Sequence, residues 1–108
     1  MKTYMGDRTI DGVIVTVDGR SLDPRKDLAR YTNGDFEWTY EGDEPRQLAF
    51  AILYDHTRDM STAKAFVEPF MSSVVANLDN EWELTSADID RFIKIMTEVP
   101  SGRYEARP

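Results

Sequence analysis

The segment that most constrains the fold of this chain covers residues 36–54, with the sequence FEWTYEGDEPRQLAFAILY. At its start, residues 35–40 alternate strictly, so Phe36, Trp38 and Tyr40 fall on one side of an extended backbone. Acidic and polar side chains fall on the other side. The alternation predicts a β-strand with a buried aromatic face and an exposed acidic face.

The same segment continues into a turn and a helix. Residues 41–45 read Glu-Gly-Asp-Glu-Pro, and Pro45 suits the first helical position because no hydrogen bond is expected from the N–H that it lacks. The acids before it complement the positive end of the helix dipole. An apolar stripe then recurs at helical spacing, consisting of Leu48, Ala49, Ile52 and Leu53. We predict a helix that buries this stripe and ends near His56.

The N-terminal part of the chain has the pattern of short strands joined by glycine turns. Residues 1–8 predict a first strand with Tyr4 pointing inward, and the β-branched run at residues 13–17 predicts a second. Asp-Gly pairs flank the second strand, as in tight hairpins, and residues 21–22 continue as a short third strand. Residues 24–31 predict one or two helical turns after an Asp-Pro pair.

Residues 63–78 form the longest helical pattern of the chain. Apolar side chains recur there every three or four positions. Pro69 lies inside this pattern, where it removes one backbone hydrogen bond and crowds the preceding turn. We therefore predict a helix with a kink or a break near Val67 or Glu68.

A short strand and a last helix follow. Residues 81–84 alternate like an edge strand, with Trp82 and Leu84 inward, and Thr85 and Asp88 have the spacing of a capping box. The apolar stripe of the helix consists of Ile89, Phe92, Ile93 and Met96. The element order predicts an α+β fold, with a small, mostly antiparallel sheet packed on one face by about three helices.

Composition agrees with one small cytoplasmic domain. The chain has 108 residues, 41% of them hydrophobic, so we assign residues 1–97 to a single domain and residues 98–108 to a flexible tail. Cysteine is absent, which excludes disulfides and thiolate chemistry. No apolar run is long enough for a signal peptide or a membrane span. The net charge of −7 disfavours direct binding to nucleic acid.

A set of residues spread over the chain carries a resemblance to a known family. The core of the pattern is W-x-Y-x-G-x-x-P-x-Q-L-A-x-x-I-L from Trp38 to Leu53, supported by Ala63, Phe70, the run Trp82-Glu83-Leu84-Thr85 and Ile89. These residues resemble a family of small uncharacterised prokaryotic and phage proteins, a domain of unknown function. The chain departs from the pattern at Glu44, where glycine is expected. The resemblance implies a stand-alone domain, common in viral and mobile-element contexts, and carries over no catalytic residue.

Acidic residues gather around both tryptophans. If residues 35–40 and 81–84 are strands of one sheet, Glu37, Glu81 and Glu83 lie together on its outer face. The candidate interaction face consists of Asp35, Glu37, Asp43, Glu44, Glu81 and Glu83. Such a face would attract a basic protein partner. The competing explanation is a solvated surface whose charges protect a sheet edge.

Two other functions remain open at this stage. His56 is the only histidine, and Asp55 and Asp59 lie close to it in sequence, so an enzyme or metal-dependent site is one alternative. A homo-oligomer joined through the kinked helix or a free sheet edge is the other. The sequence favours a non-enzymatic interaction module without cofactor or metal, acting as an accessory or anti-defence factor of a phage or mobile element.

Overall fold

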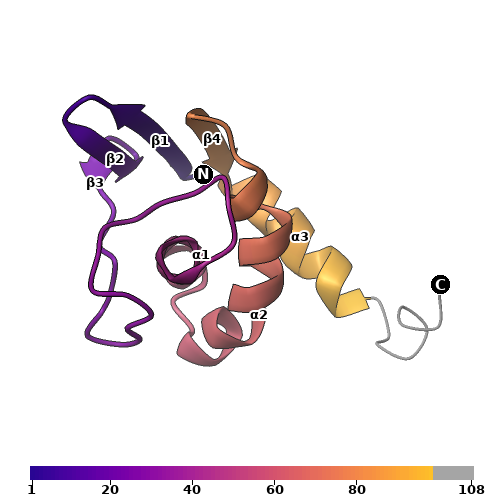
Figure 1. Cartoon of the computed structure of the whole chain (residues 1–108). Helices are drawn as coiled ribbons and strands as arrows, with labels where there is room; N and C mark the ends of the chain where they lie inside the picture. Colours follow the sequence, from indigo (N-terminus) through magenta and orange to yellow (C-terminus); the bar gives the residue numbers. More distant parts are fainter. Residues whose placement is uncertain (99–108) are drawn as a thin grey trace, which may run out of the picture.

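The computed structural model describes residues 1–98 and has the predicted α+β fold (Figure 1). Its elements are β1 (Thr3–Thr9), β2 (Gly12–Val17), β3 (Arg20–Ser21), α1 (Asp43–Thr57), α2 (Met60–Ser73), the 3-10 helix η1 (Val75–Asn77), β4 (Glu81–Thr85) and α3 (Ser86–Glu98). The tail predicted at residues 98–108 lies outside the described residues, apart from Glu98 at the end of α3.

The four strands form one antiparallel sheet in the order β3-β2-β1-β4. β2 and β3 are joined by Asp18 and Gly19, whose φ angles of 50° and 83° are both positive, as a type I′ turn requires. β1 pairs with both β2 and β4, so the last strand returns to the edge beside the first. Tyr4 is buried, which confirms the predicted inward side of β1, and Val15 and Val17 of β2 are buried on the same side of the sheet.

Helix α1 lies at the centre of the core. Its predicted stripe of Leu48, Ala49, Ile52 and Leu53 is fully buried, and so are Gln47, Phe50 and Ala51 on its other sides. Figure 1 shows α1 end-on, with the sheet above it, α2 beside it and the segment between β3 and α1 wrapped around it. Because α1 is buried on every side, it is a core helix around which the other elements pack.

Gln47 holds the wrapped segment onto α1. Its Oε1 accepts from the Tyr31 N–H at 2.7 Å, and its Nε2 donates to the carbonyls of Pro24 and Ala29 at 2.8 and 2.9 Å. The side chain is fully buried, so each hydrogen bond replaces one that water would make. Of the one or two helical turns predicted for residues 24–31, the structure has a single turn, in which the N–H groups of Leu28 and Ala29 donate to the Arg25 carbonyl at 3.0 and 3.2 Å, and no helix forms there.

Residues 35–40 do not form the predicted strand. Thr39 has a φ of 80°, which breaks the extended backbone and the alternation with it. Trp38 is fully buried and donates from Nε1 to the Asp79 carbonyl at 2.7 Å, whereas Tyr40 is 44% exposed. Phe36 is half-buried against the core. The alternating aromatic residues therefore indicated the burial of Trp38, but they did not indicate a β-strand.

Helix α2 passes through Pro69 and ends at Ser73, so the chain has no break near Val67 or Glu68, and the alternative of a kink there stays a prediction. Proline removes the hydrogen bond to the carbonyl of Ala65, and that residue is exposed, so water can satisfy the carbonyl. The long pattern predicted over residues 63–78 is divided after Ser73, where the chain continues into η1.

β4 and α3 follow the sequence prediction closely. Trp82 is buried on the inward side of the edge strand, and Thr85 and Asp88 form the predicted capping box. The Asp88 carboxylate accepts from the Thr85 N–H at 2.9 Å, and the Thr85 hydroxyl accepts from the Asp88 N–H at 3.2 Å. Ile89 is fully buried, but Met96 is 37% exposed, so the predicted stripe is wrong at its last position.

Gly6 makes room for Trp82 at the centre of the sheet. The two residues are directly opposite in the β1–β4 register, and a Cβ added at Gly6 would lie 2.2 Å from Nε1 of Trp82. The indole also packs edge-on against Trp38, with ring centroids 5.7 Å apart. Its N–H is buried and has no hydrogen-bond partner among the described residues. Only glycine lets the indole lie across β1 in this way.

Candidate functional site

The side of the sheet that faces away from the helices carries a regular array of side chains. Because successive strand residues point to opposite faces, the buried positions of β1, β2 and β4 leave the alternate positions outside. The strand registers place these in two rows: Ile14, Asp7 and Glu81 in one, and Thr16, Met5 and Glu83 in the other. We call these six residues the outer sheet face.

Three carboxylates of the outer sheet face stand close together. Asp7 lies directly opposite Glu81, and Glu83 is diagonal to Asp7 on the same side. None of the three forms an ion pair with another residue of the described chain 1–98. Like charges directly opposite in a sheet are destabilising, by roughly 0.2–1 kcal/mol. The fold therefore tolerates a repulsion that an uncharged pair would avoid.

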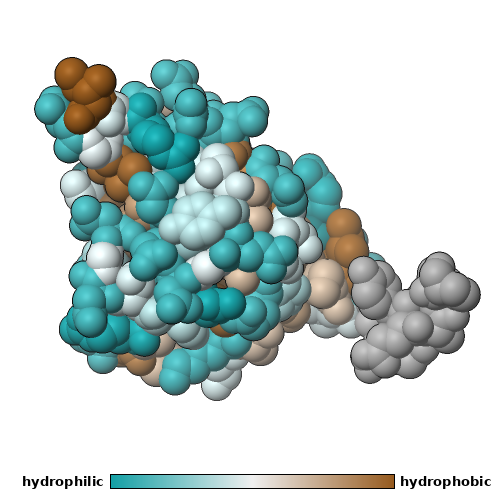
Figure 2. All heavy atoms as spheres, in the orientation of Figure 1, coloured by the Kyte–Doolittle hydropathy of each residue, from teal (hydrophilic) through white to brown (hydrophobic). Residues whose placement is uncertain are grey.

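Apolar side chains lie beside these carboxylates. Met5 is 50% exposed and Ile14 is 54% exposed, and both line a shallow hollow of about 500 Å³ with the acids of the outer sheet face. Ile10, at the tip of the β1–β2 hairpin, is fully exposed. Figure 2 shows a protruding apolar group at the β1–β2 hairpin end of a largely hydrophilic surface. Neighbouring exposed apolar residues rimmed by polar ones mark interaction sites more often than single ones do.

The structure brings together two of the six acids predicted as an interaction face. Glu81 and Glu83 are exposed on the outer sheet face. Glu37 is not, because residues 35–40 are not a strand: its carboxylate accepts from Nη2 of Arg8 at 2.7 Å at the end of the sheet. Asp35 is exposed in the segment before α1.

The other two acids have local roles at the start of α1. Asp43 forms an ion pair with Arg46, one turn further along the helix, at 2.6 Å. The Glu44 carboxylate accepts from the hydroxyls of Thr32 and Tyr40 at 2.7 and 3.1 Å. These hydrogen bonds, the one from Thr32 most strongly, lower the pKa of Glu44. Through its hydrogen bond with Thr32, Glu44 ties the wrapped segment to α1.

The structure does not bring His56, Asp55 and Asp59 together. Nε2 of His56 lies 2.6 Å from the Asp90 carboxylate on α3. Asp59 caps α2 by accepting from the Ser61 N–H at 3.0 Å. Within residues 1–98, no three His, Cys, Asp or Glu side chains are arranged to hold a metal ion. The three residues have separate structural contacts.

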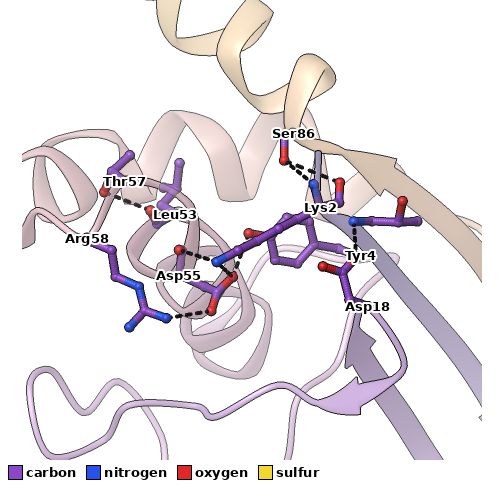
Figure 3. Close-up of polar contacts among 9 residues, drawn as sticks. Lys2, Tyr4, Asp18, Leu53, Asp55, Thr57, Arg58 and Ser86 are labelled. Carbon is purple, nitrogen blue, oxygen red and sulfur yellow. Dashed lines mark hydrogen bonds and ion pairs between the residues drawn. The ribbon is translucent and has the colours of Figure 1, made fainter.

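Asp55 instead belongs to a polar cluster that joins the N-terminus to the end of α1 (Figure 3). Its carboxylate accepts from the Tyr4 hydroxyl at 2.7 Å, from Nζ of Lys2 at 3.0 Å and from Nη2 of Arg58 at 3.4 Å. Burial alone would raise the pKa of Asp55, but the hydrogen bonds from Tyr4 and Lys2 and the nearby positive charges outweigh it and lower that pKa. Burial, reinforced by the hydrogen bond to Asp55, raises the pKa of Tyr4.

Three residues of the outer sheet face escaped the sequence analysis. Asp7, Met5 and Ile14 join the outer sheet face only through strand register, although the alternation of the first two strands could have placed them there.

No helix within residues 1–98 is long and apolar enough to cross a membrane, in agreement with the sequence.

Comparison with known proteins identifies a family and no activity. The model of a family of unknown function (DUF6166) matches residues 4–95, and the chain therefore belongs to that family. No curated protein matches the chain. No solved structure matches it either.

Proposed function

We propose that this member of the DUF6166 family is a non-enzymatic interaction module that binds a basic protein surface through its outer sheet face. The observation that carries the proposal is the unpaired acidic cluster in which Asp7 directly opposes Glu81, with Glu83 beside them. A partner with lysine or arginine at the matching positions would replace the repulsion among the carboxylates with attraction.

The apolar residues of the same surface support binding of a protein. Met5 and Ile14 are each about half exposed and lie beside the acids, and Ile10 extends the apolar surface at the hairpin tip. Burying them against a partner would supply a hydrophobic contribution, while the carboxylates would steer the encounter and select the partner. A partner that presents apolar and basic side chains next to each other fits this arrangement.

The negative charge of the outer sheet face also disfavours two other kinds of binding partner. A second copy of this chain docked on the outer sheet face would bring Asp7, Glu81 and Glu83 against another set of the same acids. A nucleic acid would present phosphates to those carboxylates, on a chain with a net charge of −7. A basic protein is the occupant for which both the apolar and the charged residues are complementary.

A pull-down with matched charge variants tests the proposal. The face variant carries Asp7→Asn, Glu81→Gln and Glu83→Gln, and the control variant carries three neutralisations at exposed acids away from the sheet, Glu41→Gln, Glu68→Gln and Glu98→Gln. Both variants change the net charge equally. The proposal predicts a basic protein that the wild type and the control retain, that the face variant loses, and that salt elutes. Equal retention by the two variants would contradict it.

The biological setting is a separate proposal. We infer an accessory or anti-defence role in a phage or mobile element from the resemblance carried by the segment between Trp38 and Leu53. The partner identified in the pull-down tests this role: a host defence protein would support it, and a housekeeping enzyme would contradict it.

A further inference from the structure

A second surface feature has the opposite charge. A pocket of about 210 Å³ lies where the β2–β3 hairpin, the segment after β3 and the end of α1 meet. Its lining residues are Val17, Arg20, Ser21, Asp23, Arg25, Tyr54, Asp55 and Arg58. It shares no residue with the hollow of the outer sheet face. Three arginines therefore converge on one small pocket of an acidic chain.

We propose that this pocket binds the phosphate group of a small molecule. The pocket is too small for a drug-sized ligand, for which ~300 Å³ or more is usual. Arginine is the side chain best suited to phosphate, because its guanidinium can donate two parallel hydrogen bonds to two phosphate oxygens. A compact, doubly charged oxyanion is the ligand class that fits both the volume and the lining.

The two aspartates of the pocket do not cancel its positive charge. Asp55 is already occupied by the Tyr4 hydroxyl and by Nζ of Lys2, which brings a further cation to the pocket wall (Figure 3). Asp23 accepts from the backbone N–H of Arg25 at 2.9 Å and forms a long ion pair of 3.9 Å with the Arg25 guanidinium, with 74% of its side-chain surface exposed to solvent. The cations that line or contact the pocket outnumber its acids.

Two of the arginines occupy backbone conformations that glycine usually holds. Arg25 has a φ of 55° and Arg58 a φ of 56°, both in the left-handed region. Such a conformation costs a non-glycine residue roughly 1–2 kcal/mol. Arg58 ends α1 at the position where glycine is most common, with its N–H donating to the Tyr54 carbonyl at 2.7 Å. Strained residues of this kind concentrate at ligand sites.

Both strained arginines lie over the same aromatic ring. The guanidinium carbons of Arg25 and Arg58 are 5.0 and 5.8 Å from the ring centroid of Tyr54. Asp27 holds the Arg25 guanidinium at 3.0 Å, so that side chain is positioned in advance. Arg58 has only a long contact of 3.4 Å to Asp55, and Arg20 forms no ion pair within residues 1–98. The N–H donors of Arg58 and Arg20 are therefore available to an oxyanion.

Titration with two phosphate probes tests the proposal. Inorganic phosphate and glycerol 3-phosphate are added separately to the folded chain at low ionic strength, and backbone amide chemical shifts are followed. The proposal predicts saturable shifts confined to residues 17–25 and 54–58. Tighter binding of glycerol 3-phosphate identifies a phosphate monoester as the ligand, and equal or tighter binding of inorganic phosphate identifies the free ion. Absence of saturable shifts with both probes overturns the proposal.

Arg58→Gly separates binding from folding. Glycine relieves the left-handed strain, so the melting temperature should stay equal or rise, while the loss of charged donors should weaken phosphate binding by about tenfold or more. Arg20→Gln, at an exposed position, is a second variant with the same predicted loss of binding. Arg30→Gln removes an exposed arginine outside the pocket and serves as the control. Wild-type affinity in both pocket variants would overturn the proposal.

Discussion

Replacing Gly6 by alanine tests how the centre of the sheet is packed. The added Cβ would meet Nε1, Cε2 and Cζ2 of Trp82 at 2.2, 2.3 and 2.6 Å. The indole would have to move by about 1 Å to restore an ordinary contact. Trp38 restricts that movement, because its ring packs edge-on against Trp82.

The size of the destabilisation depends on how the core accommodates the added methyl group. Overpacking costs about 1–3 kcal/mol, and expelling the indole would lose about 3–5 kcal/mol of burial. We expect Gly6→Ala to lower the free energy of unfolding by about 3 kcal/mol. For a domain of this size that corresponds to a fall of roughly 12–24 °C in Tm. Urea unfolding followed by tryptophan fluorescence, together with thermal unfolding, measures both quantities.

A double-mutant cycle identifies the clash as the cause. In a Trp82→Val background the Cβ at position 6 has space, so Gly6→Ala should cost less than about 1 kcal/mol. Gly34→Ala is the matched control, because its Cβ would meet the nearest atom at 3.6 Å and the position is exposed. The reasoning is refuted if Gly6→Ala costs the same in both backgrounds, or no more than Gly34→Ala.

Three further predictions concern individual polar groups. Asp7→Asn should raise the free energy of unfolding by about 0.2–1 kcal/mol by removing the repulsion from Glu81, and salt should diminish the gain in urea unfolding. Gln47→Ala should lower the free energy of unfolding by about 3 kcal/mol, because the Tyr31 N–H and the carbonyls of Pro24 and Ala29 lose their partner; an effect below about 1 kcal/mol would contradict this. Because folding lowers the pKa of Asp55, its contribution is present above about pH 4 and is lost as pH falls through the folded pKa. In Asp55→Asn, the free energy of unfolding should therefore fall less steeply on acidification than in the wild type. An unchanged dependence on pH would contradict a stabilising role of the Asp55 carboxylate.

Local signals in the sequence were sufficient for most of the elements. The β-branched run that became β2, the Asp-Gly turn after it and the Thr85–Asp88 capping box each depend on residues close in sequence. Such features form wherever the chain has the right residues at the right spacing, so they could be predicted. The α+β fold class followed from their order.

The errors arose where distant residues decide the local structure. Trp38 and Tyr40 share an alternating pattern, but the carbonyl of Asp79 and the core hold the first, while the positive φ of Thr39 turns the second to solvent. Gln47 reads as an ordinary polar helix residue, and its burial depends on a segment wrapped around α1. No short-range pattern reports either arrangement.

The candidate sites were only partly predictable for the same reason. Glu81 and Glu83 were selected from the acidic cluster, but Asp7, which opposes Glu81, joins them through the register of β1 and β4. The arginines of the proposed phosphate pocket lie in residues 20–25 and at the end of α1, and these two stretches come together only after folding. Charge along the sequence indicated an acidic chain and did not reveal its basic pocket.

Site-specific photocrosslinking tests the proposed outer-face interaction most directly. A photoreactive amino acid replaces Ile14 on the outer sheet face, and a matched variant carries it in place of Lys64 on the exposed side of α2. The account predicts a covalent adduct with a basic protein from position 14 and none from position 64, and it predicts loss of that adduct when Asp7, Glu81 and Glu83 are neutralised. Adducts of equal yield from both positions, or an adduct that survives the neutralisation, would contradict it.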